Sequence, residues 1–179
     1  LVQLQKFSID LSINSILKEE IEAVQRQVDS PADSLFKLAD ILYLKSFDQL
    51  IQNQRGSELG LILTGAFIEL MYLSIHQVDE YGESVELEVF LAEQKAVAEN
   101  LLSYLLDYQS EDAVAEAAED IAQILTLYDG MLCTYTEPKL VKKENTKFIQ
   151  GGAKCKLTEE VFNNLKQFVS DTRMRLTIN

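Results

Sequence analysis

The sequence predicts an all-α protein, an antiparallel helical bundle of about six helices with a long loop before the last helix. Apolar residues recur at helical spacing along most of the chain. The composition, with 7 Gly and only 2 Pro, is typical of helices, and the connections between successive helical segments are short, which favours antiparallel neighbours. Because 179 residues with 47% hydrophobic content can bury one sizeable core, we expect a single helical domain over residues 1–179.

Two helices are expected before residue 56. The first follows a helical apolar pattern that ends near Gln27, where Asp29, Ser30 and Pro31 interrupt it. Ser30 can then cap the second helix, with Pro31 at its first position, where the missing N–H costs nothing. We expect this second helix to end before Gly56.

The most apolar part of the chain is Leu59–Val78, LGLILTGAFIELMYLSIHQV, which predicts a third helix capped by Ser57. Because it is apolar nearly all the way round, we expect it at the centre of the bundle. It is also long enough to cross a bilayer. Glu69 at its centre argues against a span, because a carboxylate there costs at least about 2.5 kcal/mol and the flanks lack Lys, Arg or Trp anchors. We therefore expect a buried helix and no transmembrane span.

Two further helices follow. Ser84 is expected to cap a fourth helix from Val85 to about Tyr108. Ser110, followed by two acids, is expected to cap a fifth helix that runs to about Leu132, because acids are favoured at the positive end of the helix dipole.

The helical pattern lapses between Thr134 and Leu157. A proline, a cluster of lysines and a Gly-Gly pair indicate a long loop there, with a short extended pair as the alternative. Thr158 then opens the last helix. Leu157 and Phe162 occupy the two positions of a hydrophobic staple around that cap.

The net charge of −13 is unevenly distributed. The segment Asp79–Asp129 holds fourteen acids against the single Lys95, whereas nine basic residues and five acids follow from Met131 onward. Phosphates would be repelled by the middle of the chain, so we expect no nucleic-acid partner. The acidic run lacks the spacing of a calcium loop and is expected to be a solvated face. Four lysines of the loop are expected to pair with the acidic helices or to keep the loop soluble, with contact to an anionic surface as the alternative: Lys139, Lys142, Lys143 and Lys147.

The third helix carries the candidate site. Glu69 and His76, the only histidine, lie two turns apart on nearly the same face, with Tyr72 between them. Gly65 and Ala66 would let another helix approach closely beside them. One interpretation is a small ligand-binding pocket or a metal site. The other, which we expect, has Glu69 hydrogen-bonded to a Tyr or Lys of a neighbouring helix and His76 near solvent at the helix end.

The sequence shows no catalytic constellation. It has no Gly-x-Ser-x-Gly elbow, no cysteine with a histidine nearby and no glycine-rich phosphate loop before a helix. One histidine gives little support to zinc or iron chemistry. We expect no catalytic residue, metal or cofactor. The alternative is a metal-binding protein or hydrolytic enzyme that uses Glu69, Tyr72 and His76.

The two cysteines, Cys133 and Cys155, leave the cellular compartment open. We expect two thiols, with a disulfide as the alternative if the protein is exported. The chain starts at Leu1 without a methionine, so we expect it to lack upstream helices and a signal segment.

Four blocks cover most of the chain from about Asp33 to Leu176: LILTGAFIELMYLS, LAEQKAVAENLL, LTLYDGMLCTYTEPKLVKKENT and KLTEEVFNNLKQFVSDTRMRL. In their order and spacing they resemble a group of uncharacterised helical proteins from Bacteroidetes, many of them predicted cell-envelope lipoproteins. Gly65, Glu69 and Tyr72 fit the group's pattern of a glycine-rich apolar helix with a central Glu, whereas His76 does not.

The resemblance implies an exported helical domain in the periplasm or cell envelope, with a lipid anchor on a cysteine upstream of this chain. It implies no activity. We therefore expect a non-enzymatic domain that binds a protein or a small-molecule ligand through a groove between helices.

Overall fold

A computed structural model describes residues 44–143 and 146–178, and it divides the chain into two compact units between Leu59 and Gly60, inside helix α4 (Gly56–Ile75). The first expected helix lies outside the described residues, and the second is confirmed as a helix over residues 44–52. The prediction of a single domain remains a prediction.

The start of α4 differs from the expectation. The helix begins at Gly56, so Ser57 lies inside its first turn instead of preceding it. The Ser57 hydroxyl donates to the carboxylate of Glu58 at 3.0 Å, and Arg55 donates to the same carboxylate at 2.8 Å. Ser57 therefore interacts with a neighbouring acid and does not act as the cap.

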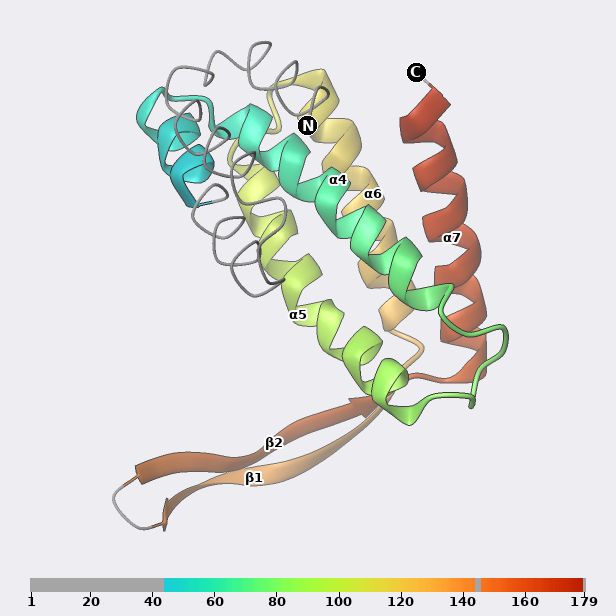
Figure 1. The fold of residues 1–179 in the computed structure, drawn as a ribbon. Coiled ribbons are helices and arrows are strands. Elements are labelled where there is room, and N and C mark those ends of the chain that lie inside the picture. Colours follow the sequence, from blue (N-terminus) through green and yellow to red (C-terminus); the bar gives the residue numbers. More distant parts are fainter. Residues whose placement is uncertain (1–43, 144–145, 179) are drawn as a thin grey trace, which may run out of the picture. The chain divides into compact units, whose positions relative to one another are not determined.

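The second unit is a helical bundle with a β-hairpin between its last two helices (Figure 1). Beside the rest of α4 it contains α5 (Val85–Leu106), α6 (Asp112–Tyr128), β1 (Leu132–Lys143), β2 (Thr146–Lys156) and α7 (Glu159–Ile178). The hairpin extends from the end of the bundle where α6 finishes and α7 begins. The helical bundle is confirmed, but the long loop is wrong, because an antiparallel strand pair occupies that stretch.

Two of the predicted helix starts are confirmed. Ser84 is the N-cap of α5 and its hydroxyl accepts the N–H of the third residue after it, at 3.2 Å. Thr158 does the same at the start of α7, again at 3.2 Å. Leu157 and Phe162 are both buried beside this cap, as a hydrophobic staple requires.

Helix α6 begins one residue later than predicted and ends earlier. Glu111 is its N-cap and makes no side-chain cap bond, so the predicted cap at Ser110 is wrong. The helix ends at Tyr128, not near Leu132. A Cβ added at Gly130 would lie 2.8 Å from a methyl group of Val161, so a glycine is needed where the chain passes from α6 into the hairpin.

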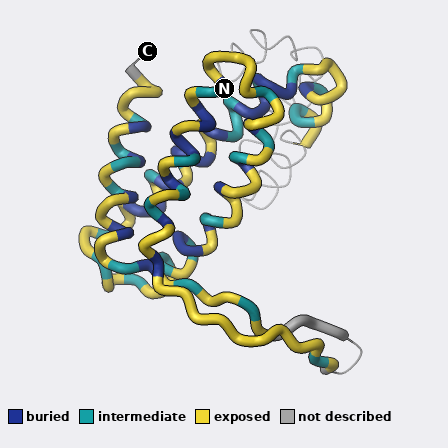
Figure 2. Tube along the Cα trace, turned by 180° about the vertical axis from the view of Figure 1, so that it is seen from behind, coloured by how far each residue is buried: buried dark blue, intermediate teal, exposed yellow. Residues whose placement is uncertain are grey.

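The core of the second unit is formed by one face of each helix (Figure 2). The Tyr128 hydroxyl, buried with its ring, donates to the Leu91 carbonyl oxygen at 2.7 Å and so ties α6 to α5. Burial raises the pKa of Tyr128. Ten core residues of the described chain are completely inaccessible: Met71, Ile75, Leu91, Ala98, Leu105, Val114, Ile121, Ile124, Leu165 and Val169.

Helix α4 lies at the side of the bundle and not at its centre, because Leu70 and Leu73 are 44% and 57% exposed. The expectation of a central helix is therefore wrong. By length and composition α4 could also cross a membrane, and 44% of its most apolar window is buried within the structure. The core helix of a water-soluble protein has the same properties, so the absence of a span stays a prediction.

The hairpin pairs from Leu132 opposite Lys156 to Lys143 opposite Thr146, with one irregularity between Thr136 and Lys139. Gly151, at φ +108°, faces that irregularity, and a Cβ added to it would lie 2.6 Å from the Glu137 carbonyl oxygen. The proline and the glycine pair that predicted a loop thus form a β-bulge inside continuous strands.

Candidate functional site

Glu69 forms a two-point ion pair with Arg173 of α7. The Nε of Arg173 donates to Oε2 at 2.6 Å and an Nη donates to Oε1 at 3.1 Å. This hydrogen bonding, with the positive charge of Arg173, lowers the pKa of Glu69 below its usual value. Both carboxylate oxygens are engaged, which suits an ion pair between helices better than proton donation to a substrate.

Tyr72 and His76 continue the same interface. The Arg173 guanidinium lies 4.3 Å from the centre of the Tyr72 ring, at cation–π distance, and the Tyr72 and His76 ring centres are 4.2 Å apart. His76 Nδ1 lies 2.8 Å from the Tyr72 carbonyl oxygen, and its Nε2 lies 3.4 Å from the Ser170 hydroxyl. Three of the four candidate residues are therefore brought together.

The contacts of this interface favour helix packing. The Ser170 hydroxyl donates to the Lys166 carbonyl oxygen at 2.6 Å, so its proton is not directed at His76 as a nucleophile's would be. Within residues 44–143 and 146–178, no group of three or more His, Cys, Asp or Glu side chains could hold a metal ion. Glu69 does contact a neighbouring helix as expected, but its partner is an arginine, not a tyrosine or lysine.

Gly65 lies apart from this interface. The prediction that it lets another helix approach closely is wrong. It is exposed, and a Cβ added to it would meet no atom within 4 Å. The close approach occurs one turn earlier, at Gly60, where an added Cβ would lie 2.9 Å from a methyl carbon of Leu105 on α5. The helical pattern alone could not tell which glycine faces a neighbour.

Gly65 instead borders a groove between α4, α6 and α7 that the sequence did not indicate. The groove has a volume of about 290 Å³ and is lined mainly by apolar atoms. Its lining residues are Leu61, Thr64, Gly65, Ala113, Glu116, Ala117, Asp120, Arg175 and Leu176.

One edge of the groove carries a fixed charge cluster. Arg175 of α7 donates to Glu116 at 2.6 Å and to both oxygens of Asp120, each at 2.6 Å. The Asp120 side chain is only 11% exposed, and its hydrogen bond raises the pKa of Arg175. The guanidinium is thus held in place by two carboxylates, and the cluster keeps one net negative charge.

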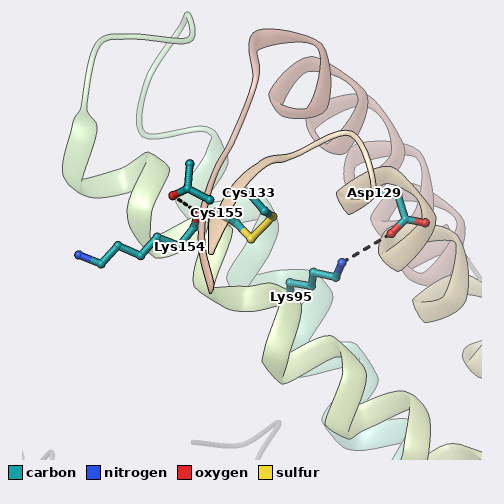
Figure 3. The surroundings of a disulfide bond; sticks show 6 residues. Lys95, Asp129, Cys133, Lys154 and Cys155 are labelled. Carbon is teal, nitrogen blue, oxygen red and sulfur yellow. Dashed lines mark hydrogen bonds and ion pairs between the residues drawn. A yellow bond between two sulfur atoms is a disulfide. The ribbon is translucent and has the colours of Figure 1, made fainter. Parts of the chain in front are cut away.

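The two cysteines form a disulfide at the base of the hairpin (Figure 3). Cys133 and Cys155 are directly opposite in the register, with their Cα atoms 4.0 Å apart. Nearby, Lys95 of α5 pairs with Asp129 at 3.5 Å. The expectation of two thiols is therefore wrong, and the disulfide is of the kind that persists in oxidising compartments.

Two features of the site escaped prediction because they join distant parts of the chain. Arg173 lies 104 residues after Glu69, and Arg175 lies 55 residues after Asp120, so no local pattern links these partners. Comparisons with protein-family models, with curated proteins and with solved structures find no match to this chain, so the groove and the hairpin have to be interpreted from their own chemistry.

Proposed function

We propose that this chain is a non-enzymatic, exported helical protein that holds a small apolar molecule with an uncharged or cationic head in the groove between α4, α6 and α7. The observation that carries the proposal is the groove itself. Its volume of about 290 Å³ is close to the lower end of ligand pockets, roughly 300 to 1,000 Å³. A helix about 10 Å wide would need a longer and wider surface, so a small molecule is the better occupant.

The preference for the head group follows from the charge cluster at the groove's edge. Arg175 is already paired with Glu116 and Asp120. An anionic head would have to displace one of these carboxylates and would face the other, whereas a neutral or cationic head meets an edge with one net negative charge. The apolar part of the ligand would contact Leu61, Ala117 and Leu176.

The non-enzymatic part of the proposal is supported by what Glu69, Tyr72 and His76 do. Glu69 forms an ion pair with Arg173 through both carboxylate oxygens. The Tyr72 ring contacts the guanidinium of Arg173, and the His76 ring packs against the Tyr72 ring. Each side chain is used in the contact between α4 and α7. If the purified protein hydrolysed an ester, glycoside or phosphate substrate and Glu69→Gln abolished that activity, this part of the proposal would be wrong.

Export to the periplasm or cell envelope is supported by the disulfide and by the lipoprotein-like sequence blocks. A cystine between Cys133 and Cys155 is stable where thiols are oxidised. A lipid anchor upstream of this chain is part of the same proposal.

The groove is tested with Nile red, a neutral apolar dye, titrated into the purified protein while its fluorescence is followed. Gly65→Leu should fill the groove, because no atom lies within 4 Å of an added Cβ and a leucine fits there without moving the core. We expect dye affinity to fall at least about tenfold, equivalent to roughly 1.4 kcal/mol.

Ala66→Leu is the matched control, since Ala66 is the neighbouring exposed residue of α4 and does not line the groove. It should bind the dye like the unmodified protein. Equal losses in both variants, or none in either, would contradict the groove as the binding site.

The head group is tested by displacing the dye with decanol, decylamine and decanoate, which share one chain length. Decanol and decylamine should displace the dye at lower concentrations than decanoate. If decanoate is the best competitor, the assigned charge preference is wrong while the groove itself still stands.

A further inference from the structure

The hairpin Leu132–Lys156, called the arm below, exposes positive charge and apolar side chains together. It holds six lysines and two glutamates. Leu132, Tyr135 and Leu140 are 68%, 73% and 69% exposed. In the described part of the chain, no ion pair is formed by the arm's lysines whose side chains are described: Lys139, Lys142, Lys154 and Lys156.

Strand β2 of the arm contacts α5, and Cys155 at its base packs against the core, but the described lysines of the arm form no ion pair with the acidic helices among the described residues. The arm extends from the end of the bundle (Figure 1), and its surface is exposed along nearly its whole described length (Figure 2). Lys139 and Lys142 therefore do not pair with the acidic helices among the described residues, while the other half of that expectation, that they keep this segment soluble, stays a prediction. Their charge is available to another molecule.

The same chain carries a complementary surface on α5. Glu86, Val89, Glu93 and Val97 follow one another at helical spacing along one side of α5, called the outer face of α5 below. Val89 and Val97 are 52% and 46% exposed, and both glutamates are exposed without an ion-pair partner among the described side chains. This face thus alternates acids with apolar residues, and the side of the arm that carries Lys139 and Lys154 also carries Val141.

We propose that the arm of one copy lies on the outer face of α5 of a second copy. Opposite charges meet, and the exposed Val89 and Val97 are covered beside Val141 of the arm. The arm is long enough to cover this face, since a strand of 12 residues spans about 40 Å and the stretch of α5 from Glu86 to Val97 about 17 Å. A second copy is the occupant that this complementarity favours, because both surfaces belong to the same chain.

The contact uses the side chains of the arm and not strand addition at its edges. The sheet has two strands within the described residues, so both edges are open. Lysines on such edges discourage pairing with another strand. Lys139 and Lys154 border one hollow of the arm, about 570 Å³ in volume, with Glu137, Thr134 and Thr136, so this side of the arm keeps one net positive charge.

The proposal predicts self-association that weakens with salt. Between about 0.05 and 1 M salt the screening length falls from above 10 Å to about 3 Å, which removes attraction between exposed charges. Sedimentation velocity of the purified chain should show association at low salt and monomer at high salt. A monomer at every salt and protein concentration would overturn the proposal.

Two charge-reversal variants identify the surfaces. Lys139→Glu with Lys154→Glu changes the arm, and Glu86→Lys with Glu93→Lys changes the outer face of α5. Each should weaken association at low salt at least about tenfold, because like charges would then face each other. A 1:1 mixture of the two variants should associate again, since each restores the opposite charge for the other.

Glu119→Lys with Glu160→Lys is the matched control, because both residues are exposed and the change in net charge equals that of the α5 variant. It should associate at least as well as the unmodified chain, and melting curves should show all variants folded. Failure of the mixture to associate would overturn the proposal. So would a monomeric chain whose arm lysines are instead required for binding phosphatidylglycerol vesicles, which would make a membrane the partner.

Discussion

The helical bundle and the arm of the second unit differ in how far they bury their apolar side chains. The bundle gains its stability from apolar side chains that four helices bury completely, such as Ile121 and Leu165. The arm has no second layer to cover it, and its large apolar residues stay exposed. An isolated two-stranded hairpin is marginally stable in water. Its order therefore depends on the disulfide at its base and on the pairing of its two strands.

The difference indicates a division of roles. Removing apolar area from water contributes about 25 cal/mol per Å², so exposing residues such as Tyr135 and Leu140 forgoes stability. The bundle supplies the stability of the unit, while the arm keeps its side chains exposed for contact with another molecule. Three predictions test this comparison, from the largest expected effect to the smallest.

Truncating one buried leucine should separate the two regions most clearly. Leu165→Ala in α7 should reduce the free energy of unfolding by about 2 to 5 kcal/mol, because its side chain is completely buried and a cavity would remain. Leu140→Ala in the arm should change it by no more than about 0.5 kcal/mol, since that side chain is 69% exposed. Urea titration followed by circular dichroism measures both. Comparable losses would mean that the arm contributes to the core.

Removing the disulfide should affect the arm and spare the bundle. The cross-link joins residues 22 positions apart at the base of the arm, where it holds the two strands together. In Cys133→Ser with Cys155→Ser, amide hydrogen exchange of the arm should become much faster while the melting temperature of the helices changes little. A large drop in that melting temperature would show that the arm and the bundle unfold together.

Replacing Glu69 should have the smallest effect, and it should depend on pH. In the folded protein the pKa of Glu69 lies below the ordinary 4.5, because Arg173 favours the charged form. Its stabilising contribution is therefore present above about pH 4.5 and is lost as the pH falls through the lower folded-state value. Glu69→Gln should melt slightly earlier than the unmodified protein at pH 7, and the difference should disappear in acid.

His76→Gln is the control for that comparison. His76 is exposed, so this change should alter stability by less than about 1 kcal/mol. If the melting difference caused by Glu69→Gln persisted unchanged at low pH, the ion pair with Arg173 would not be its source.

The sequence predicted the features that depend on near neighbours. The starts of α5 and α7 were predictable from Ser84 and Thr158, because a cap is formed with a residue three positions away. The helical spacing also placed Glu69, Tyr72 and His76 on one side of α4, where they do lie along a common interface.

Features that depend on distant partners could not be predicted in this way. Apolar content alone suggested a central position for α4, yet its neighbours cover only one side and leave Leu73 exposed. The glycine pair in the middle of β2 predicted a loop, although Gly151 is required because the Glu137 carbonyl of the opposite strand approaches it. The groove needed three helices from separate parts of the chain to be brought together.

The bond between Cys133 and Cys155 has one more consequence. The described residues between them belong to the hairpin, and most of those whose burial is described are exposed and so accessible to a protease. A single cut there would leave the segment that ends in α6 and the segment that contains α7 covalently joined. Such a nicked protein would migrate as one species on a non-reducing gel and as two fragments after reduction, with α7 still held against α4 and α6 by Arg173 and Arg175.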